Sequence, residues 1–165
     1  MGSGDGSFLV ALARRLPARN FLGVERLLGR LRKTDRKALR AGLRNVRLIR
    51  IEASYLVEYL LPPESVEVLH VYFPDPWPKR RHECRRLIDD RFARNAQRVL
   101  APGGVIYLRT DDLDYFSQAQ AVFAGVAGFL PIETPGPLRE LLTDFETEFR
   151  SRGIRTRYAA CRRTS

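Results

Sequence analysis

Apolar residues recur along this chain with two different spacings, and each spacing predicts one kind of secondary structure. Phe8, Leu12 and Leu16 occupy every fourth position, which predicts a short helix that ends at Pro17. Residues 45–52 instead alternate apolar and polar side chains, as a half-buried strand does. The expected helices cover residues 8–16, 27–43, 55–61, 88–99, 116–126 and 138–150, and the expected strands cover residues 20–25, 45–52, 66–73, 105–109 and 154–161.

This alternation of helices and strands predicts an α/β fold with a mostly parallel central sheet and helices on both faces. The length of 165 residues suits a single domain over residues 1–165. In such sheets, ligands bind beyond the carboxyl ends of the strands. Glu25, Glu52, Asp75 and Asp111 each follow one of the expected strands, so we expect acidic side chains at the binding site.

Glycines at positions 2, 4 and 6 stand directly before the first expected helix. Glycines let a backbone approach a ligand closely, and the helix N-terminus offers free N–H donors, although a merely flexible start is the structural alternative.

Glu25 ends the next strand about twenty residues later, where an acid commonly accepts hydrogen bonds from the ribose of an adenosine cofactor. It could instead pair with a surface arginine. At the following strand end, Glu52 could accept the adenine amino group and Ala53 leaves room for the ring. The residues expected around the adenosine are Gly2, Gly4, Gly6, Glu25, Glu52 and Ala53.

The most specific motif is residues 73–79, which read Phe-Pro-Asp-Pro-Trp-Pro-Lys. Its three prolines fix φ angles and stiffen the loop. Trp77 offers a flat surface on which a base could stack. Asp75 lies at the carboxyl end of a strand, where it can meet both cofactor and base. A rigid structural turn would explain the prolines, but not Asp75 and Trp77 together with the basic residues that follow.

The charge of the chain favours an anionic partner. The formal net charge is +10 and the pI is about 10.4, which suits nucleic acid better than an anionic membrane surface. A charge run is usually a solvated face, but here it adjoins the proline loop, so we expect it to contact a phosphate backbone. The run contains Arg81, His82, Arg85 and Arg86, and the next helix adds Arg91, Arg94 and Arg98 on one side.

Two isolated cysteines, Cys84 and Cys161, predict neither a disulfide framework nor a metal site, and they fit a reducing cytoplasm. No apolar run approaches the length of a membrane span, and no signal peptide is visible. We therefore expect a cytoplasmic protein without metal or membrane partners. We expect it to be a monomer or a homodimer.

Taken together, these motifs resemble the bacterial tRNA (guanine-N7)-methyltransferases. The similar segments are the proline loop 73–79, the basic run 81–86, the turn 99–104, Thr110-Asp111, residues 143–146 (Thr-Asp-Phe-Glu) and strand 21–25. They span essentially the whole chain in the same order. The resemblance implies a Rossmann-like class I methyltransferase fold, S-adenosylmethionine as cofactor and a guanine in the variable loop of tRNA as substrate.

The resemblance also implies roles for individual residues. Glu25, Glu52 and Asp75 would contact the cofactor, and Asp75 would be the catalytic residue. The basic run Arg81, His82, Arg85 and Arg86 would touch RNA. The residues implied around the substrate are Lys79, Asp111, Thr143, Asp144, Phe145 and Glu146.

The sequence departs from the family at its start. Family members carry a strand that ends in an acid before the glycine loop, where this sequence has Met1, so we expect the sheet to lack its first strand. Its loss would leave neighbouring strands unpaired and remove one cofactor contact. Glu52 stands where Asp or Asn is commoner, and Asp144 where a basic residue is usual. Two alternatives stay open: a non-catalytic or truncated RNA-binding remnant, and an enzyme that methylates nucleic-acid amino groups.

Overall fold

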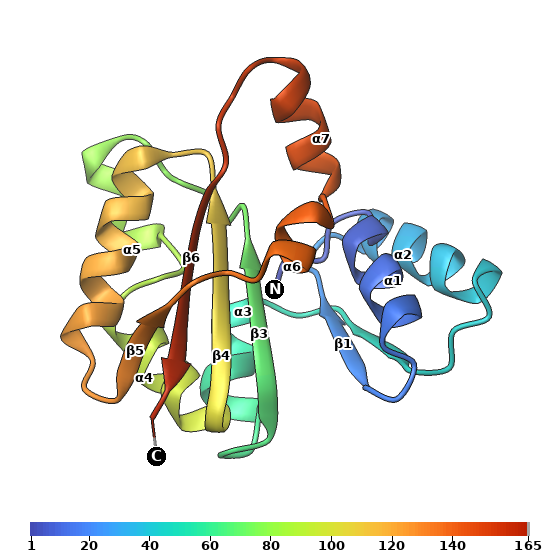
Figure 1. Cartoon of the computed structure of the whole chain (residues 1–165), viewed down its shortest axis with the longest axis horizontal. Helices are drawn as coiled ribbons and strands as arrows, with labels where there is room; N and C mark the ends of the chain where they lie inside the picture. The colour runs from blue at the N-terminus through green and yellow to red at the C-terminus, as the bar shows by residue number, and fades with distance from the viewer. Residues whose placement is uncertain (165) are drawn as a thin grey trace. The chain divides into compact units, whose positions relative to one another are not determined.

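The computed structural model describes residues 1–164, except the side chain of residue 80, and the chain forms two compact units. The first unit contains Met1–Ala53 and Pro135–Gly153. The second contains the rest of the described chain. Figure 1 shows the elements of each unit, and each unit is described by itself. The expectation of one domain stays a prediction.

The first unit opens with two helices packed on a pair of parallel strands. These elements are α1 (Ser7–Arg15), β1 (Phe21–Val24), α2 (Leu28–Arg40) and β2 (Val46–Ile49). The strands pair in parallel from Phe21 opposite Val46 to Val24 opposite Ile49. Ala13 and Ala38, both buried, let the two helices pack closely over Val46. All four elements were expected, with ends shifted by a few residues.

The same unit contains two short helices where one was expected. These helices are α6 (Gly136–Glu140) and α7 (Asp144–Ser151). The backbone of Leu141 is extended and Thr143 has the extended conformation of an N-cap, so the helical path is interrupted between them. The periodicity of apolar residues does not show this break, because an N-cap is a local signal.

The second unit contains a four-stranded sheet in the order β3-β4-β6-β5. Its strands are β3 (Val66–Tyr72), β4 (Leu100–Thr110), β5 (Phe129–Ile132) and β6 (Arg157–Arg163). β3 and β4 are parallel, but β6 lies between β4 and β5 and is antiparallel to both. The sheet is therefore mixed: β3, β4 and β5 run in one direction and β6 runs in the opposite one, so the expectation of a mostly parallel sheet is confirmed in part. Strand β5 escaped prediction because Pro131 is unfavourable in a strand interior, although an edge strand tolerates it.

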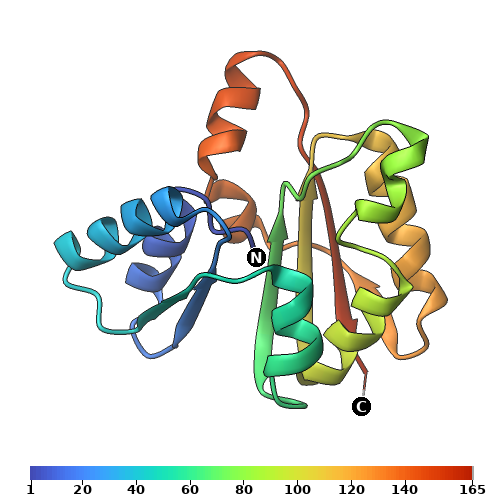
Figure 2. The ribbon, with the colours of Figure 1, turned by 180° about the vertical axis from the view of Figure 1, so that it is seen from behind.

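Helices cover one face of this sheet within the second unit. They are α3 (Ala53–Tyr55), the π-helical segment η1 (Leu56–Leu60), α4 (Asp90–Val99) and α5 (Leu113–Gly125). Helix α4 contacts η1 and α5, and Figure 2 shows these helices side by side on the sheet. Val71, Ile106 and Leu108 of the sheet are buried.

The other face of the same sheet carries aromatic rings and a buried arginine. The His70 ring stacks on Tyr107 with centroids 5.5 Å apart. Arg109 is fully buried, with its guanidinium 4.1 Å from the centroid of the Tyr72 ring and 5.5 Å from that of Tyr158. Burial lowers the pKa of His70 to about 3, and the nearby charge of Arg109 acts in the same direction.

Among the arginines expected on one side of α4, Arg91 and Arg94 are exposed, whereas Arg98 is half-buried. Arg98 donates hydrogen bonds to the carbonyl oxygens of Val57, Glu58 and Leu61 at the end of η1. Arg91 forms an ion pair with Glu58. Arg98 is therefore used to hold η1, and the expected phosphate contacts of Arg91 and Arg94 stay a prediction.

The expected loss of the first strand would leave an unpaired edge on a neighbouring strand, and each sheet has such an edge strand. Among the described residues, β1 pairs only with β2, and β3 pairs only with β4. Whether another strand belongs beside them stays a prediction. In the described part of the chain, no helix has the length and apolarity needed to cross a lipid bilayer.

Candidate functional site

The glycine loop before α1 has the backbone conformation that its residues favour. Gly2, Gly4 and Gly6 have φ angles of 66°, 57° and 81°, all in the left-handed region. A Cβ atom on Gly6 would lie 2.4 Å from Cγ2 of Thr34, so glycine there lets α1 pack on α2. A Cβ on Gly2 or Gly4 would meet no atom within 4 Å. The backbone therefore borders open space at these two positions.

Glu25 lies against this loop in the folded chain. Its Oε2 accepts a hydrogen bond from the Gly4 N–H at 3.0 Å, and its Oε1 accepts one from the Leu27 N–H at 2.9 Å. Each oxygen keeps a further lone pair for a ligand hydroxyl. The buried Ser3 Oγ has no hydrogen-bond partner among the described residues. An unpaired hydroxyl beside a carboxylate and open glycine backbone fits the polar groups of an adenosine cofactor.

Glu52 and Ala53 follow β2 at the same end of the first unit's sheet as Glu25. The Glu25 N–H donates to the Ile49 carbonyl at 3.2 Å, and Arg50 Nε donates to the Arg26 carbonyl at 3.1 Å. These bonds hold the ends of β1 and β2 together. The residues expected to bind cofactor in the first unit therefore gather at one sheet end, as the strand pattern predicts.

In the second unit, Asp75 projects from a strained loop directly after β3. Phe73 and Trp77, on either side of Asp75, have φ angles of 50° and 45°. Bulky side chains rarely adopt this region, and each such residue costs on the order of 1–3 kcal/mol. The Phe73 N–H donates to the Arg109 carbonyl at 2.8 Å, which continues the contact of β3 with β4. Asp75 itself is exposed.

Trp77 is flanked by residues of the basic run. That run forms the 3₁₀ helix η2 (Arg80–Arg85). The Arg85 guanidinium lies 5.1 Å from the centroid of the Trp77 ring, and the His82 ring centroid is 5.8 Å away. Arg81 Nε lies 3.2 Å from His82 Nε2. Lys79, Arg81 and Arg85 are exposed, so they present positive charge beside the loop.

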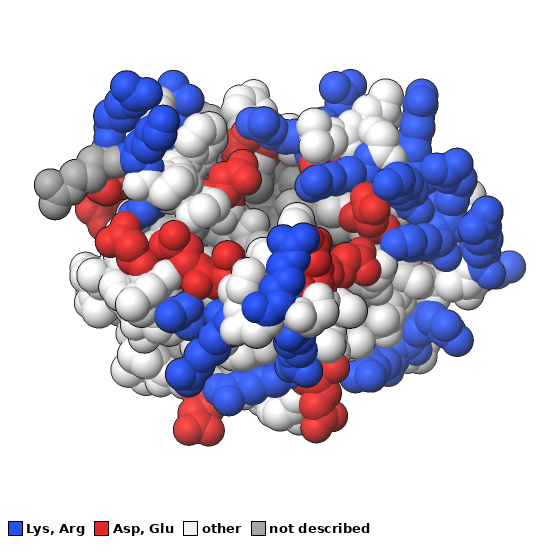
Figure 3. Space-filling model, turned by 90° about the horizontal axis from the view of Figure 1, so that it is seen from above, with Lys and Arg blue, Asp and Glu red and all other residues white. Residues whose placement is uncertain are grey.

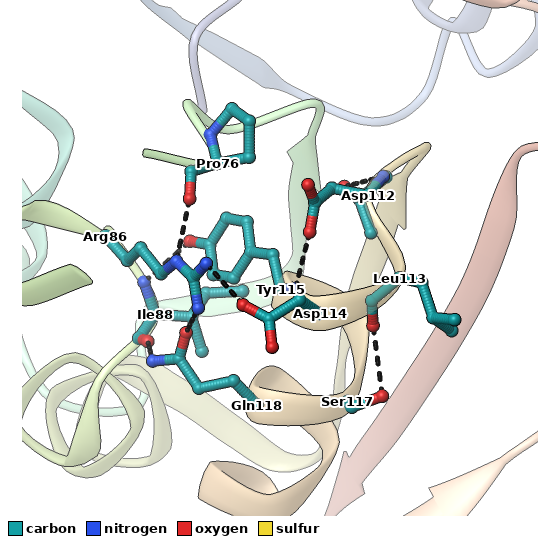
Figure 4. A network of polar contacts seen from close by, with 10 residues as sticks. Pro76, Arg86, Ile88, Asp112, Leu113, Asp114, Tyr115, Ser117 and Gln118 are labelled. Atoms are coloured by element: carbon teal, nitrogen blue, oxygen red, sulfur yellow. Dashed lines mark hydrogen bonds and ion pairs between the residues drawn. The ribbon is translucent and has the colours of Figure 1, made fainter. Parts of the chain in front are cut away.

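Arg86, the last residue of the basic run, lies in a different environment. Its side chain is only 3% exposed, and its guanidinium contacts acceptors from the proline loop and α5 (Figure 4). Burial also raises the pKa of the neighbouring Tyr115 to about 12. Arg86 therefore has no exposed guanidinium to offer to RNA, unlike Arg81 and Arg85.

Asp111 and Asp112, which follow β4, have separate roles. Asp112 is the N-cap of α5, and its Oδ1 accepts a hydrogen bond from the Tyr115 N–H at 2.7 Å. Asp111 contributes its carbonyl oxygen to Arg157 at 2.7 Å, while its carboxylate makes no hydrogen bond with a described residue. Asp112 is therefore the aspartate that caps the helix, and the Asp111 carboxylate is not used in the cap.

Residues 143–146 form a capping box at the start of α7. Thr143 Oγ1 accepts from the Glu146 N–H at 3.1 Å, and Glu146 Oε2 accepts from the Thr143 N–H at 2.9 Å. Both side chains are buried, whereas Asp144 and Phe145 are exposed. The Thr-x-x-Glu spacing is itself the signature of this motif, and it would have revealed the structural role of Thr143 and Glu146.

No group of three or more His, Cys, Asp and Glu side chains within the described residues could hold a metal ion. Burial raises the pKa of Cys161 to about 11, which keeps that thiol protonated. The candidate chemistry therefore centres on carboxylates, glycine backbone and arginines.

Known proteins that are similar to this chain indicate its family. The family model described as "Putative methyltransferase" matches residues 1–158. A tRNA (guanine-N(7)-)-methyltransferase of Geobacter metallireducens is 33% identical over 170 residues, which cover 100% of this chain and 81% of that protein. One of Syntrophotalea carbinolica is 38% identical over 129 residues, covering 78% of this chain. The match spans only 56% of the length of that second relative.

Solved structures show the same fold. The 16S rRNA methyltransferase KamB superposes with a TM-score of 0.73 over 100% of this chain and 86% of that protein, at 18% identity. At this identity the likeness concerns the fold alone, which is that of class I methyltransferases.

Proposed function

The chain belongs to the methyltransferase family whose model spans residues 1–158, and on that premise we propose that it methylates N7 of a variable-loop guanine in tRNA. The observation that carries this proposal is the strained loop that presents Asp75 at the end of β3. Strain of this kind persists where the surrounding structure enforces it, and it is concentrated at functional sites. The names of the relatives supply the guanine and the tRNA.

The proposed cofactor is S-adenosylmethionine, which supplies a methyl group whose bond to sulfur breaks as the guanine N7 lone pair attacks. Gly2 and Gly4 would let the cofactor approach the backbone, and Ser3 Oγ would gain its missing partner. Glu25 would accept hydrogen bonds from ribose hydroxyls through its remaining lone pairs, and Glu52 would accept the adenine amino group. This assignment rests on the open backbone and the unpaired hydroxyl of the loop.

The role proposed for Asp75 follows from the chemistry of guanine. N7 carries a lone pair in the neutral base, so no side chain has to remove a proton first. Orientation and electrostatics then dominate catalysis. The Asp75 carboxylate would accept from the N1–H and amino groups of guanine, and it would also offset the positive charge that appears on the methylated purine.

The surroundings of Asp75 would position the tRNA. Lys79, Arg81 and Arg85 are exposed cations suited to phosphates, and His82 lies on the same 3₁₀ helix as Arg81 and Arg85. The Asp111 carboxylate makes no hydrogen bond with a described residue and would contact the base. Asp144 and Phe145, which are exposed on the first unit, are proposed substrate contacts from the family resemblance. A tRNA substrate would place the protein in the cytoplasm.

A substrate without N7 tests this function. We expect methyl transfer to a tRNA transcript, and no transfer to the same transcript with 7-deazaguanine in the variable loop, which keeps the Watson–Crick edge. Mass spectrometry of nucleosides identifies the product. Methylated adenine or cytosine would instead identify an amino-group methyltransferase, and tRNA binding without any product would identify a non-catalytic remnant.

A further inference from the structure

Arg86 joins the proline loop to α5 through a set of short hydrogen bonds. Its Nε donates to the Pro76 carbonyl at 2.7 Å, its Nη1 to Gln118 Oε1 at 2.7 Å and its Nη2 to Asp114 Oδ2 at 2.7 Å. Figure 4 shows the guanidinium between these three residues. The guanidinium carbon also lies 5.2 Å from the centroid of the Tyr115 ring. Its donors are therefore directed into the protein.

The bond to Pro76 fixes the strained part of the loop. The Pro76 carbonyl belongs to the peptide unit that precedes Trp77, and the φ angle of Trp77 is defined by rotation relative to that unit. Trp77 has a φ of 45°, so an alternative without strain is open to it unless the peptide unit is held. Asp75 lies one residue before Pro76. A change in this peptide unit therefore moves both Asp75 and Trp77.

The segment after Arg86 is held to the same helix. Tyr115 Oη accepts from the Ile88 N–H at 3.0 Å, and Gln118 Nε2 donates to the Ile88 carbonyl at 3.2 Å. Ile88 and Tyr115 are buried, so α5 gives Arg86 a rigid support. The Asp114 side chain is 75% exposed, so the ion pair alone is weakly stabilising. The rigid support comes mainly from Gln118 and Tyr115.

We propose that Arg86 is a positioning residue that fixes Asp75 and Trp77 through the Pro76 carbonyl, and that it does not bind tRNA phosphates. The proposal rests on the proposed function for the meaning of Asp75. Because Arg86 acts on the geometry of the reacting groups, its loss lowers kcat. The exposed Arg81 would instead contribute to tRNA affinity, so its loss raises KM.

The fluorescence of Trp77 tests this proposal directly, because Trp77 is the single tryptophan of the chain. We expect Arg86→Lys to lower the emission anisotropy of Trp77 and to lower kcat about 10-fold or more, with KM for tRNA changed less than about 2-fold. The matched control Arg81→Gln should leave Trp77 anisotropy unchanged and raise KM. If Arg86→Lys does not fold, Gln118→Leu offers a milder change, because it removes only the acceptor of Arg86 Nη1. It should also lower the anisotropy of Trp77.

Unchanged Trp77 anisotropy in both Arg86→Lys and Gln118→Leu would overturn the proposal, as would a raised KM at constant kcat. The fluorescence measurement needs no methyl transfer. A wild-type protein that fails to methylate tRNA, but whose Trp77 responds to Arg86→Lys, would contradict the proposed function and leave the positioning role intact.

A shallow groove lies in the first unit, between α1 and α2. The groove has a volume of about 450 Å³. Its lining combines the small or apolar residues Val10, Ala11 and Ala41 with Ser7 and with the basic residues Arg14, Lys37 and Arg40. Lys37 Nζ donates to Ser7 Oγ at 2.7 Å, which fixes its position across the groove. Arg14 and Arg40 are exposed, and neither pairs with an acidic side chain of the described residues.

The charge of these two helices identifies the kind of partner. Together they carry eight Lys and Arg residues and one acidic residue, Asp35, in a chain of formal net charge +10. In Figure 3, Lys and Arg side chains gather on the right, over the part of the first unit where Figure 1 shows α2. Arginine guanidinium groups around a groove can donate hydrogen bonds to phosphodiester oxygens. We infer that this groove binds the RNA backbone, a role that also rests on tRNA being the substrate.

Salt dependence of tRNA binding tests this site. Arg14→Gln with Arg40→Gln should reduce the slope of log affinity against log salt by about 1 to 2, because about one phosphate contact is lost per arginine. The control pair Arg15→Gln with Arg32→Gln removes the same charge from exposed positions of the same helices outside the groove. Equal slopes for the two pairs would overturn the inference. Methyl transfer by the wild type, measured separately, shows whether the proposed function holds.

Discussion

At the scale of single residues, neighbours of the same type have opposite roles. Arg85 is exposed over Trp77, whereas Arg86 is buried against Tyr115. The sequence predicts one RNA-binding run for both, because nothing in a row of basic residues shows which side chain turns inward. That direction is set by the loop conformation and by acceptors on α5, about thirty residues further along, as expected for contacts made by tertiary packing.

A glycine substitution tests the close approach of the first loop to α2. We expect Gly6→Ala to destabilise the protein by more than about 1 kcal/mol, because it adds a clash with Thr34 to the strain of a left-handed φ of 81°. Gly2→Ala, with a φ of 66° and open space around it, should cost less. Urea unfolding of both variants measures the difference. Equal losses would mean that the contact with Thr34 does not contribute.

Among helices and strands, capping residues and prolines predict where an element ends, and the spacing of apolar residues predicts whether it is a helix or a strand. The Thr-x-x-Glu motif marks the start of α7, although the apolar pattern suggested one continuous helix from residue 138 to residue 150. The strand before the proline loop was predicted almost to its last residue, because β-branched and aromatic residues fill it and a proline follows. The antiparallel direction of β6 could not be predicted from the sequence. The direction of a strand depends on which distant strands it pairs with, and no local pattern shows this.

The capping box gives a prediction for α7. Thr143→Ala should lower the free energy of unfolding by about 1 kcal/mol, because the Glu146 N–H loses its acceptor. Thr143→Ser keeps the hydroxyl and should lose much less. Thermal or urea unfolding compares the two. A loss of equal size in the serine variant would show that the methyl group, and not the cap, stabilises this helix.

The aromatic face of β3 gives a dependence of stability on pH. His70 has a pKa of about 3 in the folded protein, below its usual value of about 6.5. Between these values the unfolded chain binds a proton that the folded chain does not, so stability is complete above about pH 6.5 and falls as the pH is lowered. His70→Gln should remove up to about 1.4 kcal/mol per pH unit of this decline. Urea unfolding from pH 7.5 to pH 5 tests it, and parallel profiles would contradict it.

In the molecule as a whole, the positions of the acidic residues relative to the strands could be predicted better than the direction in which the strands pair. The acids after the strands lie where an α/β fold places them, because a strand end fixes the position of the next residue. The antiparallel direction of β6 and the hydrogen bonds of Arg98 to η1 were not predicted. Each of these depends on contacts between distant segments. The family resemblance supplies the proposed substrate, whereas the physical patterns alone indicate only a nucleic-acid partner.

The role proposed for Asp75 in methyl transfer to guanine N7 predicts a change in the rate of N7-methylguanine formation by Asp75→Asn. Asparagine keeps the size of the side chain but removes the charge that stabilises the methylated purine. We expect the rate to fall by about 100-fold or more, with tRNA binding nearly unchanged. Asp35→Asn, an exposed position on α2, controls for loss of one negative charge. Equal rates in Asp75→Asn and the wild type would contradict the account.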